Sequence, residues 1–477
     1  MAARNVLKMD KDSISEFQKD MYNGTKDAPD IGTRYSLDFE KRAQSNHIKV
    51  KLDQIAGEEG QIIYTASKKF DVLFGLSAFV KLFPIRVKDA YTNSVSICYH
   101  HNLGHNIFPS GECKIDDDHF AFTDSIWMDC HSETFEEKRE LYNRMIGKLP
   151  FLEEWTTELP GLPLVIPQIF SFTRASQVGL PIWKSTNNKI TFEYKIRTKL
   201  IDLIRMRVLK KDGRYKEIKC NLKYLDYKSE SLPAPEMWGR YGDMSDEERN
   251  WRKSIDENTG LPNRQVLYVE DIDINSSENP ITLGKKDVIK LESLSPVKHI
   301  MWVASLVDGN LSNYTTNRED VYKGWNPCAV SNIKYGNSNR TEELGYEHYE
   351  LSEYYDFDWG GTPKEAGYNI FTYSFNPTDL QHADNAVILG NCGATLIVTL
   401  GDTDPFVSVK EKEEYTDENG ELIPAEALDK NADESNKDKY IIHVRTVILR
   451  KLEVYWDSRQ DAIKYEFIED RKIKRSN

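Results

Sequence analysis

The sequence is poor in cysteine and lacks the short motifs that mark common enzyme classes. Its 477 residues include only six cysteines, and none of them form a CxxC pair or a spacing that suggests a disulfide framework. We therefore expect reduced, mostly buried thiols. The chain also contains no G-x-S-x-G motif, no P-loop and no G-x-G-x-x-G motif. The enzyme classes that these motifs define are therefore not indicated.

Long apolar runs are absent as well. No stretch of 18 consecutive apolar residues occurs, so no transmembrane helix is expected. The N-terminal residues are polar and lack the apolar core of a signal peptide, which predicts a protein of the cytosol or nucleus. The net charge of −14 disfavours a broad nucleic-acid-binding role.

The negative charge is concentrated in one segment. Residues 411–439 contain eleven Asp or Glu and four Lys, a net charge of −7, which is half of the chain total. Because apolar residues are few there, we expect a solvated surface insertion, with a binding tail as the alternative. The basic end Arg471–Arg475 predicts a frayed terminus or, alternatively, a contact with nucleic acid or an acidic neighbouring subunit.

What the sequence does contain is strand pattern. Aromatic residues make up 11% of the chain, including 25 Tyr, and this composition suits β structure. The stretch Leu162–Val208 carries two alternations of apolar and polar side chains: Ile190, Phe192, Tyr194 and Ile196 against Lys189, Thr191, Glu193, Lys195 and Arg197, then Ile204, Met206 and Val208 against Arg205 and Arg207. A period of two predicts strands with one buried face, and the Pro and Gly residues between them indicate a sandwich.

Two helices are predicted. In Thr134–Ile146, Thr134 and Glu137 form a capping box, and Gly147 supplies the stop. A second, short helix is predicted over Asp246–Ile255, capped by Ser245.

The length indicates two domains of similar size. Strand-like runs occur in both halves: His47–Leu52, Phe70–Val80, Ser94–Tyr99, Val288–Leu291, His299–Leu306, Asn369–Phe375, Ala386–Leu389, Ala394–Leu400 and Tyr440–Leu452. A Pro/Gly-rich stretch, Ser231–Arg264, separates the halves. We predict an N-terminal arm over 1–30, a first sandwich over 31–225, a linker or inserted loop over 226–265, and a second sandwich over 266–477 with the acidic insertion 411–439.

A group of metal-ligand side chains raises the question of a metal site: Cys98, His100, His101, His105, Cys113, His119, Cys130 and His131. His101 and His105 are four apart, but Gly104 and Asn106 argue against a helix that would bring them together. We expect core and turn histidines with ordinary partners, and no metal or other cofactor. Asp116, Asp117, Asp118 and Asp129 lack the spacing of a calcium loop, so a solvated turn is favoured.

The segment Tyr346–Trp359 interleaves Tyr with Glu and Asp, which predicts a contact surface or, alternatively, an edge strand or loop. Sequons occur at Asn23 and Asn275 and at three candidate glycosylation sites, Asn310, Asn313 and Asn339. Without a secretory signal we expect these sequons to be unused by the ordinary pathway. The pair Asn310 and Asn313 predicts an exposed turn.

Several segments, taken in order, resemble the major capsid proteins of large nucleocytoplasmic double-stranded DNA viruses. Lys138–Gly147 is similar to the family's KR-x-x-YN-x-MIG helix, and Pro296–Trp302 is similar to its P-V-K-x-[IL]-x-W strand. Further similar segments are Asn102–Ile107, Phe170–Arg174 with Gly179–Pro181, Tyr373–Gln381 and Ala394–Leu400.

The resemblance implies an all-β fold of two consecutive eight-stranded jelly-roll sandwiches, a double jelly roll, with short helices in the connecting loops. It implies a structural protein and not an enzyme: a homotrimeric, pseudo-hexameric capsomer that tiles an icosahedral capsid. The implied partners are the chain itself, neighbouring capsomers, and minor capsid and penton proteins. No direct nucleic-acid contact is expected, and proximity to an inner membrane is compatible with this function.

The implied location is the virion capsid, assembled in the host cytoplasm. On this view the acidic insertion faces away from subunit interfaces, because like charges would repel there. The alternatives are a minor capsid or surface-binding component of the same particle and a metal-dependent β-sandwich enzyme.

Overall fold

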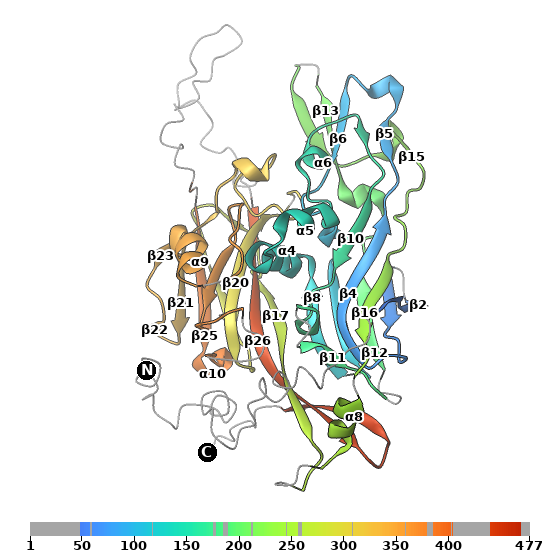
Figure 1. Cartoon of the computed structure of the whole chain (residues 1–477). Helices are drawn as coiled ribbons and strands as arrows, with labels where there is room; N and C mark the ends of the chain where they lie inside the picture. The colour runs from blue at the N-terminus through green and yellow to red at the C-terminus, as the bar shows by residue number, and fades with distance from the viewer. Residues whose placement is uncertain are drawn as a thin grey trace.

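The computed structural model describes residues 48–57, 60–116, 118–174, 178–184, 189–210, 213–244, 246–255, 260–307, 309–357, 359–378, 385–401, 403 and 439–468 (Figure 1). The predicted N-terminal arm, residues 411–438 of the acidic insertion and the basic C-terminal end lie outside the described residues. None of the helices in the described part of the chain is both long and apolar enough to cross a membrane.

The first sandwich is formed by two antiparallel sheets. One has the order β1 (Ile48–Lys51), β16 (Glu236–Gly242), β4 (Val72–Lys81) and β10 (Pro163–Pro167), with β11 (Leu180–Pro181) also paired to β4. The other has the order β2 (Asp53–Ala56), β3 (Gln61–Thr65), β12 (Ile190–Lys195), β7 (Ser110–Ile115) and β8 (Asp118–Asp124).

The second sandwich repeats this arrangement. Its first sheet has the order β17 (Arg264–Ser276), β26 (Lys439–Asp457), β20 (Val297–Leu306) and β24 (Asn369–Thr372), with β18 (Ile281–Thr282) and β27 (Ala462–Ile468) paired to β26. Its second sheet has the order β19 (Lys286–Leu291), β25 (Ala394–Leu400), β21 (Cys328–Tyr335) and β22 (Ser338–Asn339), with β23 (Leu344–Gly345) paired to β21.

The two sandwiches have the same strand order. In each unit, the first sheet begins with the earliest strand of that unit, which pairs with a strand near the unit's end in sequence. That strand pairs in turn with an early strand, and the early strand pairs with a later one. The order β1-β16-β4-β10 therefore corresponds to β17-β26-β20-β24. The second sheets correspond in the same way, β3-β12-β7-β8 to β19-β25-β21-β22. The predicted all-β architecture of two tandem sandwiches is therefore present, and the two units are structural repeats.

Alternation in the sequence explains how the strands are buried. In β12, Ile190, Phe192 and Tyr194 are buried and Lys195 is exposed, as the period of two predicts, but Thr191, which the same period assigns to solvent, is buried as well. In β13 (Ile204–Leu209) the pattern is less regular, because Arg205 is also buried. Its guanidinium is paired with Glu217 and lies over the ring of Trp155. A paired arginine therefore occupies a position that alternation alone assigns to solvent.

Two small sheets extend the first sandwich at one end, the upper right of Figure 1. They have the orders β14 (Tyr215–Ile218), β13, β6 (Val95–Tyr99) and β15 (Leu225–Tyr227), β5 (Ile85–Val87), β9 (Glu158–Leu159).

The helices are short and lie in the connections. They are α4 (Ser125–Phe135), α5 (Arg139–Ile146), α6 (Pro150–Glu153), α7 (Ser171–Arg174), α8 (Asp246–Lys253), α9 (Glu353–Asp356), α10 (Leu389–Cys392) and a π-helical turn, His348–Ser352.

The predicted helix Thr134–Ile146 is wrong at its start. Thr134 belongs to the end of α4, an element that the sequence did not predict, and α5 begins only at Arg139. The Thr134/Glu137 capping box is therefore not formed; the Thr134 hydroxyl instead lies 3.2 Å from Tyr354 Oη of the second sandwich. Gly147 ends α5 with φ 76°, as predicted.

The structure differs from two other predictions, one of a strand and one of a linker. The predicted strand Ala386–Leu389 is wrong: Val387 makes one isolated bridge with Val297, and α10 begins at Leu389. The predicted linker 226–265 contains β16, which pairs with both β1 and β4 and so contributes to the first sandwich. We propose that the change of domain falls between β16 and β17, around α8; the predicted cap residue Ser245 lies outside the described residues.

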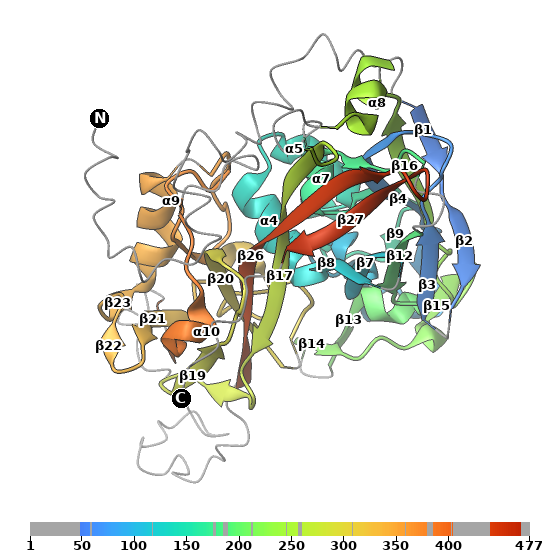
Figure 2. The same ribbon diagram turned by 90° about the horizontal axis from the view of Figure 1, so that it is seen from below.

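The hairpin β26–β27 ties the two sandwiches together. It runs beneath the first sandwich (Figure 2), where the rings of Trp456 and Trp183 stack with centroids 5.0 Å apart. The hydroxyl of Tyr465 donates a hydrogen bond to the carbonyl of Pro181. The last described strands of the chain therefore pack against the first sandwich.

Candidate functional site: the junction between the two sandwiches

The junction is formed by the outer face of the sheet β17-β26-β20-β24. Side chains of β20 alternate across this sheet: Ile300 and Trp302 enter the core of the second sandwich, whereas Met301 and Val303 join the apolar cluster of the first. On the other side α4, α7 and β8 of the first sandwich cover the face, and the ring of Phe135 lies 5.7 Å from that of His299. Burial of apolar surface on both faces makes the two units one packed body.

A cluster of buried charges spans one side of the junction. Lys148 Nζ lies 2.7 Å from Glu133 Oε1 and 2.7 Å from Glu365 Oε1. The ring of His101 bridges Glu365 at 2.8 Å and Glu153 at 2.9 Å. The side chains of Lys148, Glu133, Glu365 and His101 are at most 4% exposed. Because Glu365 belongs to the second sandwich and the others to the first, the cluster fixes how the two units meet.

The charges in this cluster depend on each other. Burial by itself lowers the pKa of His101, but the carboxylates of Glu365 and Glu153 outweigh this effect and raise the pKa to about 10. Burial by itself raises the pKa of Glu365, but His101 and Lys148 lower it well below its ordinary value. His101 is therefore an imidazolium and Glu365 a carboxylate at neutral pH.

A second buried carboxylate in the junction is also held by cations from both units. Glu270 of β17 accepts from Lys298 Nζ of β20 at 2.7 Å and from the guanidinium of Arg174 in α7. Burial raises the pKa of Glu270, but Arg174 and Lys298 together lower it to about 2.

Asp124 supplies the start of α4 and a further link across the junction. Its Oδ1 accepts from the backbone N of Trp127 at 2.6 Å and caps the helix. The same carboxylate binds Arg445 of β26, with Nε 3.2 Å from Oδ1 and Nη2 2.5 Å from Oδ2. One side chain therefore orders both the helix and its contact with the opposite sheet.

The histidines and cysteines of the predicted metal-ligand group do not gather around a common centre. His105 pairs with Asp129 and Tyr142, His119 with Glu112 and Asp271, and His100 accepts from the backbone N of Leu311. Cys98, Cys113 and Cys130 are buried. In the ranges that the structure describes, no three His, Cys, Asp or Glu side chains are placed to hold a metal ion.

The other predicted sites are also separate. Asp116 and Asp118 are exposed at the β7–β8 turn, whereas Asp129 is fully buried in α4 and accepts from Tyr314 Oη at 2.8 Å; Asp117 lies outside the described residues. The expected turn is thus present, but Asp129 has no part in it.

The predicted exposed turn at Asn310 and Asn313 is wrong. These side chains are 8% and 2% exposed, and they donate to the carbonyls of Arg318 and Asn317. Of the three candidate glycosylation sites, Asn339 alone is exposed, in β22. That these sequons are unused stays a prediction; of the three, only Asn339 offers its amide to solvent.

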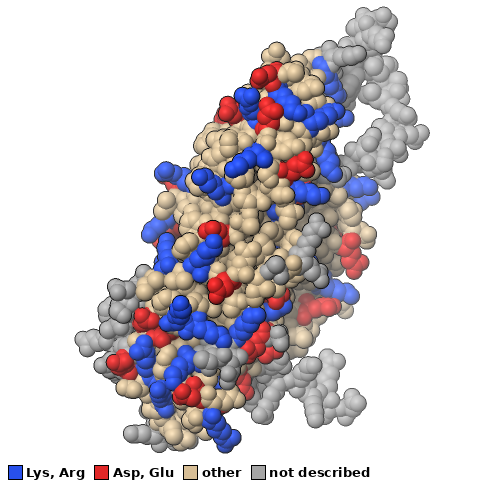
Figure 3. Space-filling view, turned by 90° about the vertical axis from the view of Figure 1, so that its right-hand side faces the viewer, with Lys and Arg blue, Asp and Glu red and all other residues tan. Residues whose placement is uncertain are grey.

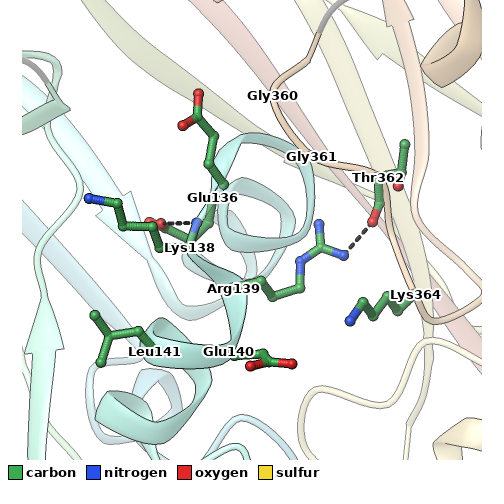
Figure 4. Close-up of a pocket in the computed structure, with 10 residues that line it drawn as sticks. Glu136, Lys138, Arg139, Glu140, Leu141, Gly360, Gly361, Thr362 and Lys364 are labelled. Atoms are coloured by element: carbon green, nitrogen blue, oxygen red, sulfur yellow. Dashed lines mark hydrogen bonds between the residues drawn. The ribbon is translucent and has the colours of Figure 1, made fainter.

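An open pocket of about 540 Å³ lies at the rim of the junction. It is lined by Glu136–Leu141 and by Gly360, Gly361, Thr362 and Lys364 (Figure 4). The guanidinium of Arg139 points across it and donates to the carbonyls of Thr362 and Glu133. The other charged residues that line the pocket are of both signs, so the pocket favours neither an anion nor a cation. Arg139 connects the two units through its hydrogen bonds.

The surface charge of the first sandwich is mixed. On the side that faces away from the second sandwich, Lys and Arg are spread among Asp and Glu (Figure 3). The net charge of −14 is therefore not a uniform property of the surface.

We expect the junction to lose stability in acid. The pKa of Glu270 falls from 4.5 to about 2 in the folded chain, so its contribution is present above pH 4.5 and is lost as the pH falls towards 2. The lowered pKa of Glu365 acts in the same direction. For Glu270 alone we expect the free energy of unfolding to fall by about 3 kcal/mol. Urea unfolding measured from pH 7 to 2.5 would report this change.

A matched pair of variants checks the cause. Glu270→Gln should be less stable at neutral pH but should show a flatter acid slope, whereas the exposed Glu278→Gln should keep the slope. An unchanged slope in Glu270→Gln would show that this carboxylate is not the titrating group.

Two tandem sandwiches with the same strand order, joined through a shared apolar face, define a double jelly roll. The solved structures that this fold resembles are viral capsid proteins. The chain matches the PBCV-1 virus capsid with a TM-score of 0.61 and 13% identity, covering 89% of this chain and 98% of that one. It matches the Faustovirus major capsid protein with a TM-score of 0.61 and 7% identity, covering 85% and 90%.

Sequence comparison also finds viral major capsid proteins. The chain is 25% identical over 316 residues to the major capsid protein of Lymphocystis disease virus 1, which covers 62% of this chain and 66% of that protein. It is 24% identical over 403 residues to the major capsid protein of Invertebrate iridescent virus 3, covering 78% and 84%. The match to the Heliothis virescens ascovirus 3e protein, 29% identical, spans only 29% of that protein. No model of a protein family matches the chain.

The chain is thus similar in sequence to the major capsid proteins of large double-stranded DNA viruses, and it has the double jelly-roll fold. The resemblance predicted from the sequence is confirmed. These relatives are structural proteins and not enzymes, in agreement with the sequence-based prediction.

Proposed function

We propose that the protein is the building block of a viral capsid and that three copies form one pseudo-hexameric capsomer. The observation that carries this proposal is the repeated strand order of the two sandwiches. Three copies around one three-fold axis would present six similar sandwiches, so a closed ring arises from one chain. A subunit of this kind must be rigid, and the buried charges of the junction supply that rigidity.

Such capsomers would tile an icosahedral shell. On this proposal the protein is located in the virion capsid and assembles in the host cytoplasm, and its partners are other capsomers together with minor capsid and penton proteins. The major subunit is favoured over a minor component because the chain spans most of the compared capsid proteins in fold, including 98% of the PBCV-1 chain.

The mass of the native particle tests the proposal. Mass photometry of the purified protein should give a species of about three times the chain mass of 55.2 kDa. A protein that stays monomeric at micromolar concentration would contradict it.

A further inference from the structure

The two sandwiches carry equivalent helical connections, and the second one, although its Tyr354 reaches Thr134 of the first sandwich, keeps large apolar side chains exposed. In the first sandwich α4 and α5 lie between β8 and β10; in the second, the π-helical turn and α9 lie between β23 and β24. The first connection covers the outer face of β17-β26-β20-β24 within the chain. The second presents Leu351 and Tyr355 to solvent, 61% and 90% exposed. Apolar side chains of this exposure on adjacent turns indicate a contact surface.

The sheet that corresponds to the covered one is exposed on its outer side. In the first sandwich, alternate residues of β1, β4 and β16 point outward from β1-β16-β4-β10, and we call this surface the basic face: Lys49, Lys51, Phe79, Lys81, Trp238 and Arg240. Phe79 and Trp238 form an edge-to-face pair with centroids 6.0 Å apart. Four cations surround this pair, and one of them, Lys51, lies 2.8 Å from Glu236, the outward-pointing acid on β16.

The second connection has the opposite charge. Residues 342–356, which we call the acidic segment, contain six Asp or Glu and no Lys or Arg. Glu342, Glu343, Glu347 and Asp356 are exposed, next to Leu351 and Tyr355. Both surfaces therefore combine an aromatic centre with charges, and the charges are complementary.

One chain cannot bring these surfaces together. In Figures 1 and 2, α9 lies in the second sandwich and β16 lies on the opposite side of the molecule, in the first. The occupant of the basic face must come from another copy.

We propose that the acidic segment of one copy docks on the basic face of the next, repeating between chains the contact that α4 makes within the chain. This inference rests on the proposed trimer and names the surfaces that close it. The contact is head-to-tail, so each copy uses one surface of each kind and three copies close the ring.

The internal repeat also identifies the central ion pair. Within the chain, Asp124 stands at the start of α4 and binds Arg445 on β26. In the second sandwich Glu347 stands at the start of the π-helical turn, and in the first sandwich Arg240 points outward from β16, the strand that corresponds to β26. The inferred pair is therefore Glu347 of one copy with Arg240 of the next.

A charge exchange tests this pair. Arg240→Glu and Glu347→Lys should each raise the concentration at which the trimer dissociates by at least ~10-fold, and the double variant should return to within ~3-fold of the unchanged protein. Dissociation is followed by mass photometry on dilution. Lys216→Glu, an exposed residue of β14 away from both surfaces, is the matched control and should have no effect.

A photo-crosslinking residue in place of Tyr355 provides a measurement that leaves the inferred ion pair unchanged. In a mixture of isotope-labelled and unlabelled copies, the crosslink should join Tyr355 to β1, β4 or β16 of another copy. A trimer that crosslinks elsewhere, or whose double variant is no better than the single ones, overturns the docking inference and leaves the trimer intact. Absence of any trimer overturns the proposed function itself.

Discussion

Replacing Lys148 with methionine should lower the free energy of unfolding by about 3–5 kcal/mol, the cost of leaving buried carboxylates without their cation. Lys148 is 3% exposed and is the ammonium that both Glu133 and Glu365 share. Methionine fills a similar volume, so the loss reflects charge rather than a cavity. Urea unfolding at pH 7 measures the change.

The matched control for this variant is Lys364→Met. Lys364 is exposed and lies next to Glu365 in the chain, so its replacement should change the free energy of unfolding by less than about 0.5 kcal/mol. If the two variants were equally stable, the buried cluster would not hold the sandwiches together. A partial rescue of Lys148→Met by Glu365→Gln would support the pairing directly, because the second change removes one of the unpaired charges.

Trp302→Ala should be destabilising by about 3–5 kcal/mol through loss of packing in the second sandwich. Trp302 is fully buried, and its ring centroid lies 5.0 Å from that of Tyr349. Because β20 contributes Met301 and Val303 to the apolar cluster of the first sandwich, we expect both units to respond. Far-ultraviolet circular dichroism and tryptophan fluorescence should therefore report the same shifted transition.

Phe375→Ala is the control for this second prediction. Phe375 is 70% exposed, so its truncation should have little effect on stability. Two separate transitions in Trp302→Ala, one of them at the position of the unchanged protein, would show that the sandwiches unfold independently.

The strands could be predicted from the sequence because their signal is local. The alternation of Ile190, Phe192 and Tyr194 records one buried face, and that face enters the first core as expected. The same holds for β4, β6, β20 and β25, where apolar runs mark strands. The helix over 134–146 was predicted at its C-terminal end because Gly147 is a local stop. The separate helix α4, which contains Thr134, was missed, and its cap Asp124 is held by Arg445, 321 positions away.

The junction could not be predicted, since it consists of charges that are distant in sequence. His101 was recognised as a potential ligand, but its partners Glu153 and Glu365 follow no spacing rule. A usable signal was present in β20, where Lys298 lies in a mostly apolar strand, and in β26, where Arg445 lies among apolar residues. Charged residues at such positions indicate a strand whose two faces are both buried, with a partner beyond the sandwich.

Electron-microscopy class averages of the purified protein test the central claim most directly. Two similar sandwiches in each of three copies should give a ring with a six-sided outline and true three-fold symmetry. A single elongated particle the size of one chain, or a ring with two-fold symmetry, would contradict the account.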